Sequence, residues 1–212
     1  MAERFPDPSA APADGLVAIG LDLLPETLLE AYGKGIFPWF SEGEPILWWS
    51  PDPRMVLFPS EFHVSRRLQR RIRQGRLRIT ENQAFAAVMR QCAAPRGQAD
   101  GTWILPEMIE AYVRLFELGY ARSVETWDGE TLVGGLYGVK LGQAFFAESM
   151  FSCRVDASKI AMAHLVERAR REGWALIDCQ FHSQHLAGLG ARLIPRHVFL
   201  QSFKHAVGAG CF

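Results

Sequence analysis

The chain has 212 residues, enough for one large domain or for a domain with a small partner. Apolar residues make up 49% and charged residues 22%, the formal net charge is zero, and no apolar run approaches the about 20 residues of a membrane helix, so a membrane-spanning chain is excluded. The opening residues, MAERFPDPSAAPADG, hold acids and prolines in place of an apolar stretch, which excludes a secretory signal peptide.

Apolar periodicity, together with the positions of capping residues, Gly and Pro, predicts a regular series of helices and strands. In chain order we expect a strand at 16–19, a helix at 25–33, a strand at 55–58, a helix at 65–75, a strand at 77–80, helices at 82–92 and 106–118, a hairpin of strands 120–127 and 130–139, a strand at 143–148, a helix at 156–171, a strand at 174–180, a short helix at 183–188, a strand at 191–194 and a closing helix at 195–207. Ser65, Asn82 and Asp156 are the expected N-caps of their helices, and Gly75 is the expected stop of the helix at 65–75.

The order of these elements indicates an α/β (α+β) fold. Pro59 marks a boundary between a small N-terminal domain, residues 1–58, and a larger domain, residues 59–212. In the larger domain a helix, a hairpin, a strand, a long helix and further strands follow one another, which is typical of an acyltransferase-like fold on a mixed sheet. This order also brings strand 143–148 near strand 174–180.

Three of the six tryptophans fall within eleven residues, between prolines and glycines that fix turns. We expect Trp48 and Trp49 in the core, whereas Trp39, which follows Pro38 in a loop, suits the lining of a pocket. The glycine-rich stretch at 132–139 does not match a nucleotide-binding fingerprint, and it predicts close approach of another backbone.

Seven arginines and no acid lie in the stretch RRLQRRIRQGRLR, from Arg66 to Arg78, so the rest of the chain carries a charge of about −7. Like charges three or four residues apart repel within a helix. A solvated helix face is one interpretation, and a polyanionic partner that neutralises the cluster is the one we favour. The candidate nucleic-acid surface consists of Arg66, Arg67, Arg70, Arg71, Arg73 and Arg76.

A carboxylate and a carboxamide lie side by side on the expected strand 174–180. Side chains alternate along a strand, so Asp178 and Gln180 share one face with Trp174, and Cys179 lies on the other face. Burying an ionised carboxylate costs several kcal/mol unless it is paired or hydrogen-bonded. Asp178 is therefore either a structural residue that holds a neighbouring loop or part of a site.

A second carboxylate, Glu148, stands inside the apolar strand 143–148. Alternation places Phe146, Glu148 and Met150 on one face. Because this strand is expected near the strand that carries Asp178, the two carboxylates should aim at the same cleft. Two carboxylates in one cleft indicate a candidate active site.

Other groups carry weaker signals. His182 and His185 are three residues apart, but the sequence offers no evident third ligand for a metal. Cys179 faces away from the carboxylate, and neither Ser149 nor Ser152 has an obvious base. Four separated cysteines without a CxxC pair indicate reduced thiols in the cytoplasm. The sequence thus predicts a site that works without a covalent nucleophile, a metal or a nucleotide cofactor.

Six segments carry long and specific patterns. They are YGKGIFPWF (32–40), ILWWSPDPR (46–54), GTWI (101–104), LVGGLYGV (132–139), FFAESMFS (145–152) and LIDCQ (176–180). These segments resemble the leucyl/phenylalanyl-tRNA–protein transferase family, and the likeness runs from about Leu16 to Phe203. It implies a small N-terminal domain beside a larger N-acetyltransferase-like domain.

The resemblance implies cofactor-free transfer of leucine or phenylalanine from aminoacyl-tRNA to the α-amine of proteins that begin with Lys or Arg, which marks those proteins for degradation. It implies Asp178 and Gln180 as the catalytic pair and Glu148 as a contact to the reacting groups. It places the arginine cluster on the protein surface that binds tRNA. We expect a cytoplasmic monomer. The residues implied for the aminoacyl pocket or its rim are Trp39, Trp103, Phe145 and Met150.

The implied chemistry agrees with the residues themselves. The donor ester is already activated, so positioning and proton handling suffice. We expect the carboxamide oxygen of Gln180 to orient the amine and Asp178 to stabilise the charge that develops on it. Glu148 adds to a negative cleft suited to a cationic N-terminal residue. An apolar pocket discriminates methylenes by only about 1–3 kcal/mol each, so methionine is also expected as a substrate.

Two other classes stay open. An acyl-CoA-dependent N-acetyltransferase shares the fold class, and the stretch from His185 to Gly190 distantly resembles its pyrophosphate loop, although Gln or Arg is wanted where His185 stands. A non-catalytic RNA-binding module explains the arginine helix but not the two strand carboxylates.

Overall fold

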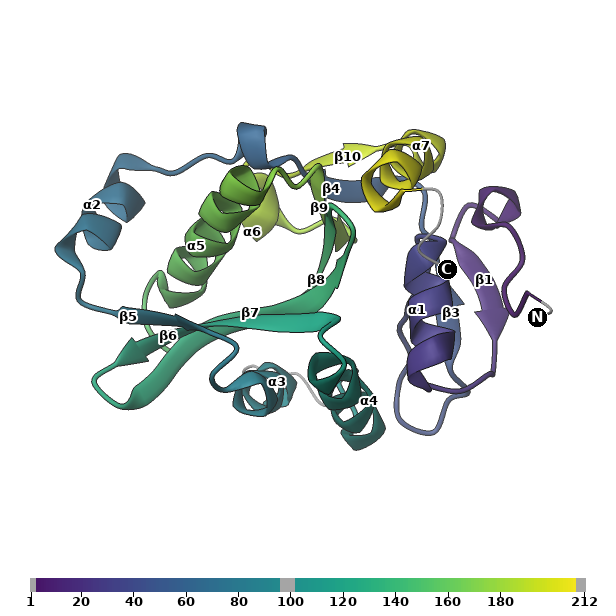
Figure 1. The fold of residues 1–212 in the computed structure, drawn as a ribbon, viewed down its shortest axis with the longest axis horizontal. Coiled ribbons are helices and arrows are strands. Elements are labelled where there is room, and N and C mark those ends of the chain that lie inside the picture. The colour runs from purple at the N-terminus through teal and green to yellow at the C-terminus, as the bar shows by residue number, and fades with distance from the viewer. Residues whose placement is uncertain (1–2, 96–101, 209–212) are drawn as a thin grey trace.

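The computed structural model describes residues 3–95 and 102–208 (Figure 1). The helices are α1 (Pro25–Gly33), α2 (Arg66–Gln74), α3 (Phe85–Ala93), α4 (Pro106–Glu117), α5 (Ala157–Glu172), α6 (Gln184–Ala187) and α7 (Arg196–Val207), with the 3-10 turns η1 (Pro8–Ala10) and η2 (Pro59–Glu61). The strands are β1 (Leu16–Ile19), β2 (Phe37–Pro38), β3 (Leu47–Trp49), β4 (Arg54–Leu57), β5 (Arg78–Glu81), β6 (Ala121–Asp128), β7 (Thr131–Leu141), β8 (Ala144–Ser152), β9 (Leu176–Gln180) and β10 (Arg192–Ile194). Cys211, one of the cysteines expected to be reduced, and residues 96–101 of the loop expected after α3 lie outside the described residues.

A seven-stranded sheet forms the centre of the molecule. Its strand order is β10-β4-β9-β8-β7-β6-β5, and among the described strands the β8–β9 pair is the parallel one. The helix α5 covers one face of this sheet, and α3 and α4 cover the other (Figure 1). Each face buries its own apolar cluster, because strand side chains alternate between the faces. The predicted α/β fold with a mixed sheet is confirmed.

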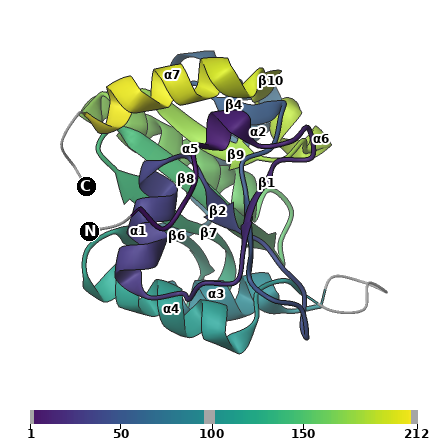
Figure 2. The same cartoon turned by 90° about the vertical axis from the view of Figure 1, so that its right-hand side faces the viewer.

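The N-terminal segment forms a separate three-stranded sheet, β1-β3-β2, with α1 beside it. Figure 2 shows α1 between α4 and α7. Trp48 is fully buried and its indole N–H donates to the carbonyl oxygen of Gly20 at 2.8 Å, as the expected core position requires. The strand β4 instead pairs with β9 and β10 in the large sheet. The expected domain boundary after residue 58 stays a prediction.

The expected N-cap at Asn82 is wrong, whereas the one at Asp156 is confirmed in its position. The helix expected from Asn82 begins at Phe85, because Asn82 has a left-handed backbone (φ +58°) and its side-chain oxygen accepts from the Ser123 N–H at 2.9 Å. Asp156 is the N-cap of α5, but its φ is +68° and its side chain makes no capping bond; it pairs with Arg71 at 3.0 Å. In both cases a contact to another element displaces the local capping bond.

The strand expected from Trp174 begins at Leu176. Trp174 lies before β9 and its ring stacks on Phe145, with ring centroids 5.6 Å apart, in the cluster on the α5 face. Leu176 packs in the cluster on the opposite face. The expectation that Trp174 shares a face with Asp178 is therefore wrong, because alternation holds only within the strand itself.

The glycines of β7 allow close approach of other backbone, as predicted. A Cβ at Gly134 would lie 2.5 Å from the Cβ of Ala157, the first residue of α5. A Cβ at Gly138 would overlap the carbonyl oxygen of Phe146 in β8. None of the helices in the described segments has the length and apolar content to cross a membrane.

Candidate active site

A pocket of about 260 Å³ opens at the point where β8 and β9 separate. The two strands pair as far as Phe146 and Asp178, and the pocket begins just beyond this pair. Its polar side chains are Glu148 from β8 and Gln180 from β9. The rest of its lining comprises Phe37, Pro38, Trp39, Trp103, Cys179 and Phe181. The pocket thus combines an aromatic wall from the N-terminal segment with a carboxylate and a carboxamide from the large sheet.

A β-bulge in β8 aims Glu148 at this pocket. The β7–β8 register shifts between Tyr137 and Gly138, so Glu148 is an extra residue in β8. A bulge changes the faces on which the following side chains lie. Phe146 packs in the cluster on the α3–α4 face, whereas Met150 packs against the cluster on the α5 face. The expectation that Met150 shares a face with Glu148 is therefore wrong.

Glu148 is half-buried and lies against two tyrosines. The Tyr112 hydroxyl donates to Oε2 at 3.5 Å, and it is also hydrogen-bonded to the Tyr32 hydroxyl. Oε1 is buried and has no hydrogen-bond partner among the described residues. Burial raises the pKa of Glu148 to about 8; Asp178 adds to this rise, while hydrogen bonds from the tyrosines and the charge of Arg54 oppose it.

Asp178 is fully buried in an ion pair with Arg54. The Arg54 Nε donates to Oδ1 at 2.8 Å and Nη2 donates to Oδ2 at 2.6 Å. The rings of Phe37 and Phe199 lie over the guanidinium, with centroids at 4.7 and 4.5 Å. The expectation that the Asp178 carboxylate opens into the same cleft as Glu148 is wrong, because Arg54 occupies both of its oxygens.

Gln180 ends β9 in a left-handed conformation, with φ +56°, which is uncommon for a residue other than glycine. Its backbone N–H donates to the Asp178 Oδ1 at 3.0 Å, so the buried carboxylate holds this turn. In the amide orientation that satisfies its neighbours, Nε2 donates to the carbonyl oxygens of Ala147 at 3.0 Å and Cys179 at 3.1 Å. The amide oxygen is then the acceptor that remains for a ligand.

The expected aminoacyl-pocket residues divide into two groups. Trp39 and Trp103 line the pocket, and Trp39 is 41% exposed. Phe145 is fully buried and stacks on Trp174, and Met150 lines a separate hollow beside α6. The structure does not bring Phe145 and Met150 to the pocket that holds Glu148, and their contact with substrate stays a prediction.

Cys179 lines the pocket but is poorly suited to attack. Burial raises the pKa of its thiol well above the usual range, so very little thiolate forms at neutral pH. Within residues 3–95 and 102–208, no group of three or more His, Cys, Asp and Glu side chains could hold a metal ion.

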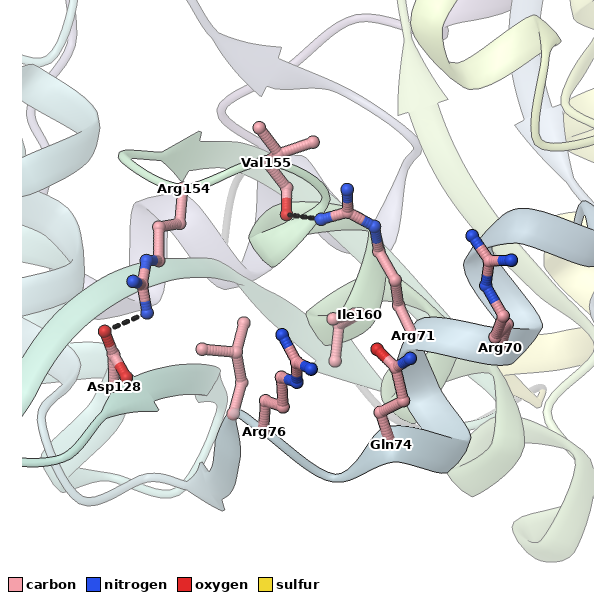
Figure 3. Close-up of a pocket in the computed structure, with 9 residues that line it drawn as sticks. Arg70, Arg71, Gln74, Arg76, Asp128, Arg154, Val155 and Ile160 are labelled. Carbon is pink, nitrogen blue, oxygen red and sulfur yellow. Dashed lines mark hydrogen bonds and ion pairs between the residues drawn. The ribbon is translucent and has the colours of Figure 1, made fainter.

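A second and larger pocket, of about 650 Å³, lies between α2, the β6–β7 turn and the loop before α5 (Figure 3). Arg70, Arg71, Arg76 and Arg154 line it. The Arg71 Nη1 donates to the Val155 carbonyl oxygen at 3.2 Å, and Arg154 pairs with the carboxylate of Asp128. This pocket extends the basic surface of α2 onto the loop before α5.

Part of the arginine cluster has acidic partners. Arg67 and Arg71 lie 3.8 and 3.0 Å from the carboxylate of Asp156, which corrects the expectation of a wholly uncompensated cluster. Four other arginines of the cluster, all exposed, form no ion pair with any residue that the structure describes; they are Arg66, Arg70, Arg73 and Arg76. These four remain available to an anionic partner.

Sequence reasoning missed Arg54, Tyr32, Tyr112 and Arg154. A buried Asp178 requires a cation, and that requirement was the available signal for Arg54. Arg54 lies 124 residues away in the chain, so no local pattern connects the two. The tyrosines come from helices in different parts of the chain and look like ordinary core residues.

Comparisons with known proteins agree over nearly the whole chain. Residues 56–204 match the family described as leucyl/phenylalanyl-tRNA protein transferase, and residues 21–52 match its N-terminal domain. A leucyl/phenylalanyl-tRNA–protein transferase of Anaeromyxobacter sp. (strain Fw109-5) is 58% identical over 96% of this chain and 87% of its own. One of Nitrosospira multiformis is 60% identical over 92% of this chain and 84% of its own. Among solved structures, a GCN5-related N-acetyltransferase from Kribbella flavida aligns with 81% of this chain and 61% of its own, at a TM-score of 0.39 and 10% identity.

Proposed function

Because this chain belongs to the leucyl/phenylalanyl-tRNA–protein transferase family, we propose that it transfers leucine, phenylalanine or methionine from charged tRNA to the α-amine of proteins that begin with Lys or Arg. The chain is an aminoacyltransferase, and its substrates are aminoacyl-tRNA and proteins. We further propose that it works in the cytoplasm and that its products are marked for degradation. The observation that carries the proposal is the pocket beyond the β8–β9 pair, where an aromatic wall meets a carboxylate and a carboxamide.

The aromatic wall suits the amino acid of the donor. Trp39 and Trp103 face a space of about 260 Å³, which fits a single amino-acid side chain. Leucine, phenylalanine and methionine are all apolar and of similar bulk, and an apolar pocket separates such side chains by only about 1–3 kcal/mol per methylene. The wall therefore supports selection of an apolar class of amino acid.

The polar side of the pocket suits the acceptor. The amide oxygen of Gln180 can accept a hydrogen bond from the incoming α-amine, whose pKa is about 7.7–8.0. Glu148 lies in the same pocket as Gln180, where its carboxyl group can contact the reacting groups of the acceptor. Asp178 acts as a positioning residue, because its carboxylate holds the Gln180 backbone and does not line the pocket.

The reaction needs orientation more than activation. The neutral amine attacks the ester carbonyl carbon, a C–N bond forms, and the ester C–O bond to the tRNA ribose breaks. A proton passes from the amine to the ribose oxygen, so the sum of atoms and charges is unchanged. The basic surface of α2 would hold the tRNA by its phosphates, which positions the ester without reading the tRNA sequence.

The test is transfer of labelled leucine from charged tRNA to a peptide that begins with Arg. We expect label in that peptide and in a matched peptide that begins with Lys. The same peptide with an acetylated N-terminus, or with Glu as first residue, should remain unlabelled. No label in the Arg peptide, or equal label in the Glu peptide, would contradict the proposal.

A further inference from the structure

A pair of buried tyrosines lies against one oxygen of Glu148. Tyr32 comes from α1 and Tyr112 from α4, and both side chains are fully buried. Their hydroxyls are hydrogen-bonded to each other, and the Tyr112 hydroxyl also donates to the Glu148 Oε2 at 3.5 Å. The Tyr32 ring packs edge-on against Phe146, two residues before Glu148, with centroids 4.8 Å apart. Two elements distant in the chain thus deliver hydroxyl groups to the carboxyl that the bulge presents.

The other oxygen of Glu148 has a different environment. Oε1 is buried and accepts no hydrogen bond from the described residues, although buried acceptors are normally satisfied. Glu148 also lines the pocket that contains Gln180. We propose that Tyr32 and Tyr112 are positioning residues that fix Oε2, so that Oε1 receives a proton from the α-amine of the acceptor protein. This inference rests on the proposed function, because the amine is its substrate.

Glu148 then acts as the general base of the transfer. As the amine nitrogen bonds to the ester carbonyl carbon, its N–H bond breaks, the electron pair stays on nitrogen and the proton goes to Oε1. The ester C–O bond breaks next, with its electron pair on the ribose oxygen. Glu148 returns the proton to that oxygen, so the carboxylate is regenerated and no co-reactant is required.

The surroundings of Glu148 suit this exchange. Burial raises its pKa to about 8, so it is a stronger base than an ordinary carboxylate, and a fraction of it is ionised near neutral pH to accept the proton. The groups that act on it come from four elements: Tyr32, Tyr112 and Arg54 lower its pKa, and Asp178 raises it. Loss of a tyrosine hydroxyl should therefore raise the pKa of Glu148 further.

The first measurement is the pH dependence of kcat/KM for leucine transfer to an Arg peptide. In the wild-type chain both the amine and Glu148 must lose a proton, so log kcat/KM should rise with a slope near two below about pH 7 and level off above about pH 8.5. Glu148→Gln removes one of the two titrating groups. Its slope should fall to one, and its plateau should fall by about 10²–10⁴-fold, the range for loss of a general base.

The second measurement repeats the profile for Tyr32→Phe and Tyr112→Phe. Each change should raise the pKa of Glu148 and so move the rising part of the pH profile to higher pH. Activity at neutral pH then falls by up to about tenfold for each unit by which that pKa rises, and it recovers at high pH. Thr27→Val is the matched control, because it removes a buried α1 hydroxyl that has no partner among the described residues. Its profile should coincide with the wild type.

Three results would overturn the inference. The first is a loss of activity in both tyrosine variants that is the same at every pH. The second is a slope of two in the plot of log kcat/KM against pH that persists in Glu148→Gln. The third is a rising part of that plot that Thr27→Val moves to higher pH as far as the tyrosine variants do. If the wild-type chain labels the Arg peptide but the variants give any of these results, the proposed function stands and this mechanism is contradicted. A wild-type chain that labels no peptide contradicts both.

Discussion

At the scale of single residues, the Arg54–Asp178 pair changes what a substitution can test. Asp178→Asn would replace an acceptor oxygen of the pair with an amide N–H group, and Arg54 would keep a buried charge without a full partner. Removing one member of a buried pair costs about 3–5 kcal/mol. We therefore expect Asp178→Asn to lower the free energy of unfolding by about that amount in urea titrations. A loss of transfer activity in Asp178→Asn would then reflect the misplacement of Gln180 as well as the loss of the Asp178 charge.

A double variant separates these two effects. Asp178→Leu with Arg54→Met removes both charges, and apolar replacement of a buried pair is often neutral for stability. Stability should return toward the wild type, while transfer should stay low because the Gln180 N–H has lost its acceptor. An Asp178→Asn chain as stable as the wild type would contradict this account of the pair.

Glu148 makes stability depend on pH in a known direction. The unfolded chain releases this proton near about pH 4.3, whereas the fold retains it until about pH 8. Between these values the folded state binds more protons than the unfolded state, so the contribution of this carboxyl to stability falls as pH rises. Glu148→Gln should raise Tm at about pH 9, where the carboxyl is ionised in the fold, and leave it unchanged at about pH 4, where the carboxyl is protonated in both states. A difference in Tm that is constant across this range would contradict the raised pKa.

Trp39 and Trp48 offer a matched comparison between pocket and core. Trp39 is 41% exposed and lines the pocket, whereas Trp48 is fully buried. Trp39→Ala should raise the KM for the charged tRNA with less than about 1 kcal/mol change in stability, since exposed substitutions are usually mild. Trp48→Ala should lose about 3–5 kcal/mol, the range for truncating a buried aromatic side chain. A collapse of Tm in Trp39→Ala would assign that residue to the core.

At the scale of elements, local pattern predicted most of the fold. The expected cap and stop of α2 are confirmed: the Ser65 side chain accepts from the Leu68 N–H at 3.2 Å, and Gly75 is left-handed with φ +60°. The strands β2 and β3, of two and three residues, are too short to show a period. The expected N-cap position was wrong at Asn82 and right at Asp156, and at both residues a contact with a distant element replaces the local side-chain bond.

The candidate site was predictable in its strands and not in its partners. Glu148 and Gln180 meet in one pocket because β8 and β9 are neighbours, which the order of elements indicated. The bulge in β8 leaves no mark in the apolar pattern, so the change of face at Met150 could not be predicted. Arg54 and the two tyrosines become partners only through tertiary packing.

The bulge also gives a prediction about Gly138, which lies across from it in β7. A Cβ at this position would overlap the Phe146 carbonyl oxygen and lie 2.7 Å from the Phe145 ring. Gly138→Ala should cost at least about 1–3 kcal/mol by overpacking, and it should reduce transfer by displacing Glu148. Gly188→Ala is the control, because its nearest neighbours would be at 3.5 Å, in ordinary contact. Equal stability of the two variants would contradict the close approach of β7 and β8.

At the scale of the whole molecule, the site depends on both sheets. The N-terminal segment supplies Phe37, Pro38 and Trp39 to the pocket and Tyr32 to the buried tyrosine pair. The large sheet supplies the polar groups. The helix α2 lies at the other end of the molecule from the N-terminal segment (Figure 1). The proposed tRNA-binding surface of α2 and the proposed site of transfer therefore lie in different regions of the molecule.

This separation predicts different responses to two donors. Changing Arg66, Arg70 and Arg73 to Ala removes three exposed charges that have no ion pair with the described residues. Affinity for charged tRNA should fall, and the slope of log affinity against log salt should decrease by up to about 0.9 per lost duplex phosphate contact. Transfer from leucyl-adenosine, which carries no phosphate, should keep its wild-type rate because the pocket is intact. Arg114→Ala, on the exposed surface of α4, is the control and should leave the salt slope unchanged. An unchanged slope in the triple variant, or an equal loss with leucyl-adenosine, would contradict a phosphate-binding role for α2.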